Sequence, residues 1–142
     1  MRKITKEEIN TVLESHALWL NSNKLAGKRA DFTGADFTGA CFTGVNLTGA
    51  DFTYAKLVGA NLYRAILTGA DFTGANLSSA NLTYAKLVDA NLTGAILYRA
   101  NLTGAILRCA DLTYANLTYA DLTYADLTYA DFTGVIHDEV GK

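Results

Sequence analysis

The chain repeats a unit of five residues 21 times between Ala30 and Gly134, without an insertion or a deletion. The unit reads A-(D/N)-(L/F)-T-(G/Y). Alanine occupies every fifth position from 30 to 130 except at Val45, and leucine or phenylalanine follows two positions later in every unit. A short, constant period indicates a fold made by stacking equal units. The repeat therefore predicts an architecture in detail and says little about an activity.

Within the unit, the first and third residues are apolar and the second is polar, as in a half-buried strand. The fourth and fifth residues delay the next apolar residue by one position, which predicts a two-residue corner after each very short strand. Corners that all turn in one sense close the chain into a coil with alanine and leucine or phenylalanine inside. Four phenylalanines recur at multiples of four units, which favours four units per turn: Phe32, Phe52, Phe72 and Phe132.

The A-(D/N)-(L/F)-x-x pattern resembles the repeat of the pentapeptide repeat family over about three-quarters of the chain. The resemblance implies an all-β solenoid, a right-handed quadrilateral β-helix in which the alanine and the leucine or phenylalanine positions are directed inward. At four units per turn, the 21 units make about five coils. The absence of proline suits a chain in which nearly every backbone N–H is needed as a hydrogen-bond donor.

The segment before the first unit follows a different period. Apolar residues at helical spacing between Ile9 and Leu20, and a capping-box pair of Thr5 and Glu8, predict a helix at about 6–21. We expect this helix to cap the open face of the first coil and so to block edge-to-edge pairing. The predicted parts are a helical cap and linker, a β-helix and a short C-terminal tail, at 1–29, 30–134 and 135–142.

The last units carry four tyrosines, one on each predicted side: Tyr114, Tyr119, Tyr124 and Tyr129. One interpretation is that they pack along the outer corners and stiffen the terminal coil. The other is that this end of the rod is an interface, because aromatic residues are enriched where proteins meet. A tail-to-tail homodimer would then cover the exposed strand edge. The resemblance supports this second interpretation, since several members of the family dimerise through their C-terminal ends.

No constellation in the sequence indicates a catalytic site, a cofactor site or a metal site. His16 lies on the apolar stripe of the predicted helix, where packing is the expected role, and His137 lies in the tail. Neither has a serine, cysteine or carboxylate at a spacing that suggests a triad. Cys41 and Cys109 are separated by more than three of the predicted coils, too far within one rod for a disulfide or a shared metal. We therefore expect no enzymatic activity.

In a four-sided arrangement, one side of the rod is acidic. Its outward column carries five aspartates, one asparagine and no lysine or arginine: Asp31, Asp51, Asp71, Asn91, Asp111 and Asp131. One interpretation is that Asp and Asn suit the backbone at this position and keep the rod soluble. A second is that the column imitates the phosphates of duplex DNA. A third is that it binds a cation or a basic partner.

The function expected from the sequence is a non-catalytic protein-binding or scaffold module whose protein partner is unknown. The alternative, implied by the resemblance, is a DNA-mimicking regulator of a type II topoisomerase, because some members of the family bind DNA gyrase and protect it from quinolones. This chain departs from those members. Its rod is short, it has no inserted loop, and the nine Asp and five Lys or Arg of its repeats give a net charge of only −4.

The net charge of the whole chain, −2, gives no electrostatic reason to expect direct nucleic-acid binding. No run of about 18 apolar residues suggests a membrane span, and the first residues lack the apolar core of a signal peptide. We therefore expect a cytoplasmic protein that binds neither nucleic acid directly nor a membrane.

Overall fold

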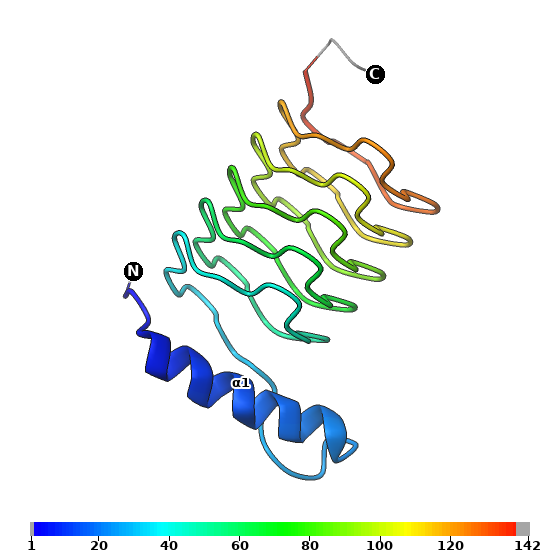
Figure 1. The fold of residues 1–142 in the computed structure, drawn as a ribbon. Helices are drawn as coiled ribbons and strands as arrows, with labels where there is room; N and C mark the ends of the chain where they lie inside the picture. The colour runs from blue at the N-terminus through cyan, green and yellow to red at the C-terminus, as the bar shows by residue number, and fades with distance from the viewer. Residues whose placement is uncertain (1, 139–142) are drawn as a thin grey trace.

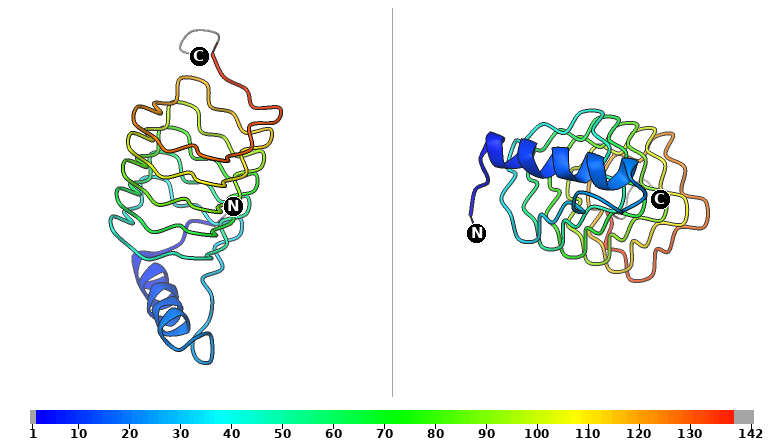
Figure 2. Two further views of the ribbon diagram at one scale, coloured as in Figure 1. Left: turned by 90° about the vertical axis from the view of Figure 1, so that its right-hand side faces the viewer. Right: turned by 90° about the horizontal axis from the view of Figure 1, so that it is seen from below.

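The computed structural model describes residues 2–138. In this part of the chain the one regular element is the helix α1 (Lys6–Asn21), and a stack of coils follows it (Figure 1). Single-residue parallel bridges connect the coils in place of extended strands. Viewed along the stack, the coils superpose into a rod, and α1 lies across the first of them (Figure 2).

The register of the stack is four units. Every bridge within the repeats joins equivalent positions of units four apart, for example Asp51 to Asp71 and Asn81 to Asn101. One turn of the rod therefore takes four units, as the phenylalanine spacing and the resemblance predict. The same bridging continues beyond the last full unit, where Ile136 pairs with Asn116.

Four of the five backbone amides in a unit donate to backbone carbonyls, as the unit 70–74 shows. The second amide donates to the Ala50 carbonyl of the preceding coil at 2.9 Å, and the third and fifth donate to carbonyls of the following coil at 2.7 and 2.9 Å. The first amide closes the corner by donating to the Leu67 carbonyl at 3.0 Å. These bonds join each coil to both of its neighbours, which explains why a chain without proline suits this fold.

The fourth amide of the unit has a side-chain acceptor. The Thr73 amide donates to Oδ1 of Asp71 at 2.9 Å, and the same oxygen accepts the Thr73 hydroxyl at 2.6 Å. Where the second residue is asparagine the bond is the same, since the Thr83 amide donates to Oδ1 of Asn81 at 3.0 Å. Both side chains offer an Oδ1 acceptor. The backbone therefore accounts for Asp or Asn at this position, and does not choose between them.

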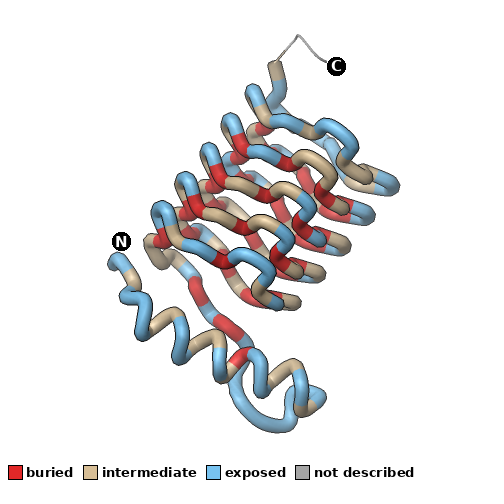
Figure 3. The backbone as a smooth tube through the Cα atoms, in the orientation of Figure 1, coloured by how far each residue is buried: buried red, intermediate tan, exposed pale blue. Residues whose placement is uncertain are grey.

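The interior of the rod contains the alanine and the leucine or phenylalanine of each unit (Figure 3). Leu92, near the middle, has no exposed surface. The Phe52 and Phe72 rings lie 4.9 Å apart and nearly parallel, and Phe32 lies 5.1 Å from Phe52. These three phenylalanines form a column along the axis, as their spacing predicts, while Phe132 belongs to the last coil and is 38% exposed.

The fifth residue of each unit lies at a corner where φ is positive. Glycine adopts this conformation without a steric penalty, as Gly74 does at φ 64°. In other units the corner residue has a side chain, for example Tyr84 at φ 56° and Arg99 at φ 57°. A left-handed conformation costs a residue other than glycine roughly 1–2 kcal/mol. The non-glycine corners are therefore strained, and the backbone alone does not explain the residues found there.

The helix α1 begins with the predicted capping box. The Thr5 hydroxyl accepts the Glu8 amide at 3.1 Å, and the Glu8 carboxylate accepts the Thr5 amide at 2.8 Å. Along the helix, Ile9, Val12 and Leu13 are half-buried and pack against the core of the coils. The amphipathic face predicted from the sequence is thus the face that contacts the rod.

Two contacts near α1 were not predicted. Lys3 forms a parallel bridge with Asp36, so the segment before the helix pairs with the first coil as a neighbouring coil would. After the helix, Gly27 lies at φ 73° against the backbone of Ser15, where any Cβ would collide with the Ser15 carbonyl oxygen. Only glycine lets the linker approach the helix this closely.

His16 connects α1 to the first coil. Its side chain is fully buried, and its Nδ1 accepts a hydrogen bond from the Ala30 amide at 2.9 Å, so the ring proton lies on Nε2. The Trp19 ring stacks on it at a centroid distance of 5.4 Å. Burial lowers the pKa of His16 below its ordinary value of 6.5. The packing role predicted for His16 therefore includes a polar contact that requires a neutral ring.

We predict that the free energy of unfolding decreases as the pH falls from 6.5 toward the lowered pKa of His16, because the unfolded state binds a proton that the folded state excludes. The variant His16→Asn keeps an acceptor for the Ala30 amide and does not titrate, so its stability should stay level over this range. Urea unfolding of both proteins between about pH 5 and pH 7 measures the difference. The same pH dependence in both proteins would contradict the assignment.

Candidate interaction surfaces

The predicted acidic column exists on one side of the rod. Parallel bridges link its members in order: Asp31, Asp51, Asp71, Asn91, Asp111 and Asp131. Each aspartate of the column accepts bonds from the amide and hydroxyl of the threonine two positions later. The structure therefore brings all five predicted aspartates to one surface, and gives each a local structural role there.

The threonine bonds also favour the charged form of Asp111 and Asp131. The hydroxyl and amide of Thr113 lower the pKa of Asp111 below its ordinary value of 3.8, and those of Thr133 do the same for Asp131. These carboxylates are accordingly ionised near neutral pH. The side presents aspartates on neighbouring coils, about 4.8 Å apart, with one gap at the neutral Asn91.

One cation lies beside the column, although no lysine or arginine was expected on this side. The Arg29 guanidinium is 3.4 Å from Oδ2 of Asp51 and also donates to the Gly49 carbonyl at 3.2 Å. It therefore offsets part of the charge at the N-terminal end of the column. The position of Arg29 could not be predicted from the repeat, because Arg29 precedes the first unit and the repeat period does not specify where a linker residue lies.

The four predicted C-terminal tyrosines occupy the corners of four consecutive units, so they do not form one patch. The Tyr114 ring lies over Gly134 of the next coil, and the Tyr119 ring lies 5.9 Å from the Tyr98 ring of the preceding coil. Tyr124 and Tyr129 are 90% and 85% exposed. The first two tyrosines thus contact a neighbouring coil and are 65% and 60% exposed, whereas the last two are more exposed still.

The last coil also exposes part of the rod interior. Leu112 is 1% exposed, whereas Leu122 and Leu127 are only half-buried. The amides of Leu127 and Tyr129 donate to no backbone carbonyl within residues 2–138. Apolar side chains and unpaired donors therefore lie together at this end, as at the edge of a sheet.

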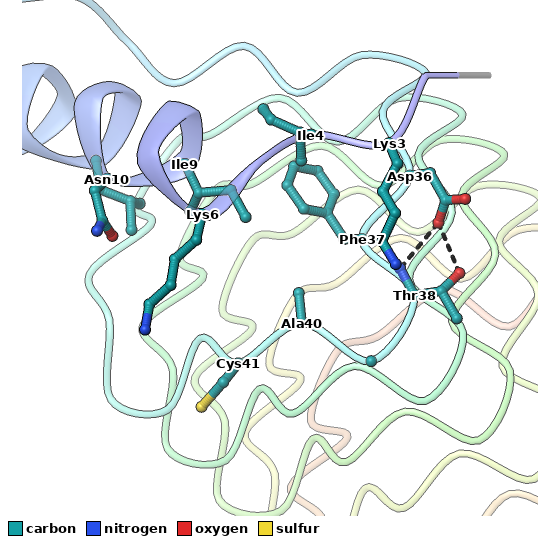
Figure 4. Close-up of a pocket in the computed structure, with 12 residues that line it drawn as sticks. Lys3, Ile4, Lys6, Ile9, Asn10, Asp36, Phe37, Thr38, Ala40 and Cys41 are labelled. Atoms are coloured by element: carbon teal, nitrogen blue, oxygen red, sulfur yellow. Dashed lines mark hydrogen bonds between the residues drawn. The ribbon is translucent and has the colours of Figure 1, made fainter.

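A groove of about 390 Å³ lies between α1 and the first coil (Figure 4). Ile9 and Phe37 are among its apolar lining residues, and Lys6 and Cys41 are among its polar ones. A hydrogen bond with the Thr43 hydroxyl lowers the pKa of the Cys41 thiol. None of the described lining residues is a histidine, so the groove lacks the neighbouring base that usually activates a cysteine nucleophile.

The described residues contain no group of three His, Cys, Asp or Glu side chains close enough to hold a metal ion. Cys41 and Cys109 are both free thiols. Between residues 2 and 138, no helix has the length and apolar character needed to cross a bilayer.

Comparison with family models finds pentapeptide repeats at residues 28–49, 46–83, 55–94, 85–123 and 109–136. A solved pentapeptide repeat protein of the cyanobacterium Cyanothece 51142 is 30% identical, with a TM-score of 0.68 and coverage of 78% of this chain and 85% of that one. A pentapeptide repeat protein of the Arabidopsis thaliana thylakoid lumen is 33% identical, with a TM-score of 0.58 and coverage of 76% and 72%. No curated protein matches the chain.

A plasmid-mediated fluoroquinolone resistance protein is also similar, at 23% identity and a TM-score of 0.45, with coverage of 76% and 68%. This likeness is too distant to assign its activity to the chain. Because one of the closer relatives comes from a thylakoid lumen, the cytoplasmic location stays a prediction. The family match extends over all the repeats, and the two closer relatives carry the same repeat and the same β-helix. The chain therefore belongs to the pentapeptide repeat family.

Proposed function

We propose that the chain is a non-catalytic protein-binding module that serves as a rigid scaffold. In this proposal, residues 30–134 are the rod of about five coils, residues 1–29 cap its first coil, and residues 135–142 form a tail. The binding groups are the outward side chains at the second, fourth and fifth positions of each unit. Because the register holds each of them in a constant place, the rod presents a preorganised surface, which lowers the entropic cost of binding.

The observation that supports this proposal is that Tyr124 and Tyr129 are exposed although they occupy strained corners. Both occupy left-handed corners, at φ 58° and 60°, where glycine would be unstrained. Both are nevertheless almost fully exposed, so packing within the described chain does not offset the strain. Exposed tyrosines are frequent among the residues that dominate binding energy at protein interfaces. We infer that these two rings contact a partner.

A second copy of the chain is the partner that we propose for this end. Each copy has half-buried leucines and unpaired amides on its last coil, so two copies related by a twofold axis would cover the same surface on each other. At the other end of the rod, α1 packs across the first coil. Association through the C-terminal ends would therefore stop at a dimer and would not continue into a fibre.

The variant Tyr124→Gly/Tyr129→Gly tests this interface. Glycine relaxes both corners, so the fold should be at least as stable, while the dimer should dissociate because its aromatic contacts are lost. Light scattering at micromolar concentration should give twice the chain mass for the natural protein and a single chain mass for the variant.

The matched control is Tyr54→Gly, which removes a tyrosine from a corner far from the C-terminal end. This variant should remain dimeric. A natural protein with the mass of one chain at every concentration would refute the proposed interface.

A second candidate function is the DNA-mimicking regulator of DNA gyrase. It is supported by the acidic column, which places five aspartates along one side with one gap at Asn91. Two observations weaken it. Arg29 pairs with Asp51 at 3.4 Å, and the threonine bonds give the aspartates a structural role that needs no partner. We therefore rank it below the protein-binding scaffold.

The variant Asp71→Asn/Asp111→Asn separates the two functions. Asparagine keeps the Oδ1 acceptor, as Asn91 does for the Thr93 amide at 3.0 Å, so the fold should be retained while two charges are removed. In a gyrase supercoiling assay, we expect neither the natural protein nor the variant to inhibit. Inhibition by the natural protein that the variant loses would establish the mimic as the better assignment.

A further inference from the structure

Two arginines of the rod each lie beside a pair of tyrosine rings that contact each other edge to face, at ring-centre distances of 6.1 Å for Tyr63 and Tyr84 and 5.9 Å for Tyr98 and Tyr119. The Arg64 Cζ lies 5.2 Å from the ring centre of Tyr63 and 5.8 Å from that of Tyr84. The Arg99 Cζ lies 5.2 Å from Tyr98 and 5.9 Å from the ring of Tyr119. The two arrangements match in chemistry and in spacing, because in both the second tyrosine comes four units after the arginine, on the next coil.

These arrangements depart from the repeat in the same way. The Thr-Gly or Thr-Tyr that ends most units is replaced by Tyr-Arg at 63–64 and at 98–99, and at no other place in the chain. Arg64 and Arg99 occupy strained corners, at φ 56° and 57°. In the unit 60–64, a threonine at the fourth position would also offer a hydroxyl to Asn61, as Thr73 does to Asp71, whereas in the unit 95–99 the second residue is Ile96, which cannot accept one. The backbone thus gives no reason for Tyr-Arg in these units.

Neither guanidinium has an acidic partner among the described residues. The ion pairs found between residues 2 and 138 involve other cations, among them Arg108, whose Nε lies 4.0 Å from Asp126. Each guanidinium lies within 6 Å of two ring centres, which restricts its position and leaves its planar fork of N–H groups without an acidic partner among the described residues. Such a fork is preorganised to bind a carboxylate with two hydrogen bonds.

Both arginines border one side of the rod, which we call the asparagine side. Bridges at the four-unit register link its second positions in the order Cys41, Asn61, Asn81, Asn101 and Asp121. Arg99 occupies the corner just before this side, and Arg64 the corner just after it. They are seven units apart in a rod with four units per coil, which places them about 8 Å apart along the axis.

The surface between the two arginines is rich in hydrogen-bond donors. Asn61, Asn81 and Asn101 each use Oδ1 to accept the amide two positions later. No hydrogen bond within the described residues uses their Nδ2 groups, which are donors. Aspartate would make the same backbone contact, and it does so along the acidic column. Asparagine here replaces a row of charged acceptors with a row of neutral donors.

We propose that the asparagine side binds an extended acidic peptide segment of a partner protein. This proposal deepens the protein-binding function proposed above and rests on it. The Arg64 and Arg99 guanidiniums each bind one carboxylate of the segment, and the asparagine Nδ2 groups donate hydrogen bonds to its carbonyl oxygens. The tyrosines hold the guanidiniums in place and cover the aliphatic part of the bound chain.

A peptide fits this surface better than a nucleic acid. A long polyanion is attracted by many cations at once, whereas this side has two arginines in a chain whose net charge is −2. Two carboxylates suffice to engage both guanidiniums. In an extended segment, which advances about 3.3 Å per residue, two acidic residues a few positions apart cover the axial part of the separation, and the segment crosses the side obliquely because the arginines lie at its opposite corners.

Fluorescence anisotropy with the full chain tests the proposal. The probes are labelled peptides of glycine and serine that carry two glutamates at varied separations, each with a twin in which glutamine replaces glutamate. We expect at least one glutamate peptide to bind, its glutamine twin to bind about tenfold more weakly or worse, and the affinity to fall with added salt. The variant Arg64→Gly/Arg99→Gly should bind the glutamate peptide about tenfold more weakly than the natural protein does.

Glycine is the residue that these corners favour, so this variant should unfold at no lower temperature than the natural protein. The matched control is Arg108→Thr, which removes an arginine that already pairs with Asp126 and restores the residue most common at that position. It should bind the peptide as before. Arg99→Lys should bind more weakly than the natural protein, because lysine keeps the charge without the planar fork.

Three results would overturn the proposal. They are equal binding of the glutamate and glutamine peptides, undiminished binding by Arg64→Gly/Arg99→Gly, and an arginine-dependent affinity for oligothymidylate that exceeds that for every peptide. Light scattering of the same samples separates this site from the C-terminal interface. A dimer that binds no peptide refutes only the asparagine side, whereas a monomer that binds the peptide refutes only the interface.

Discussion

In most units of the rod, a side chain bonds the one backbone amide that stacking leaves without an acceptor, the fourth. Stacking provides backbone acceptors for the other four amides, but the Thr73 amide has only the side chain of Asp71 as its acceptor. A buried or half-buried amide without a partner is costly, and the cost would recur in every unit. The advantage of an Oδ1 two positions earlier therefore explains why Asp and Asn dominate the second position, although the six units with Cys, Lys or Ile there keep the same register. Because Asp and Asn make the same contact, the backbone does not determine whether the surface at this position is charged or neutral.

That freedom distinguishes the sides of the rod. On the acidic column Asp is used almost throughout, and on the asparagine side Asn61, Asn81 and Asn101 follow one another. The two sides make the same contacts with the backbone, yet one presents carboxylates and the other presents amide donors between two fixed guanidiniums. Fold and surface chemistry are thus specified by different atoms of the same side chains, and the rod can display unlike surfaces without a change in its core.

Much of the fold could be predicted from the sequence because the repeat is strictly local. The spacing of Phe32, Phe52 and Phe72 reports the number of units per turn, and the Thr5 and Glu8 pair reports the start of α1. What could not be predicted lies outside the period, such as the pairing of Lys3 with Asp36 and of Arg29 with Asp51. The stacking of Arg64 on Tyr84 becomes visible only once the register is known, since the two belong to units that are four apart in the sequence.

The four-unit register also constrains how such a chain can change its length. Removing a single unit between Phe52 and Phe72 would keep an apolar residue at every inward position, although Phe72 would no longer stack on Phe52. It would, however, turn the whole C-terminal remainder by a quarter of a revolution, so that Asp111 and Asp131 would leave the acidic column and Arg99 would move to a different corner. Only the loss or gain of a whole coil preserves the surface. The interior therefore keeps its apolar pattern when the length changes by one unit, whereas the outward pattern and the phenylalanine column are kept only in steps of four.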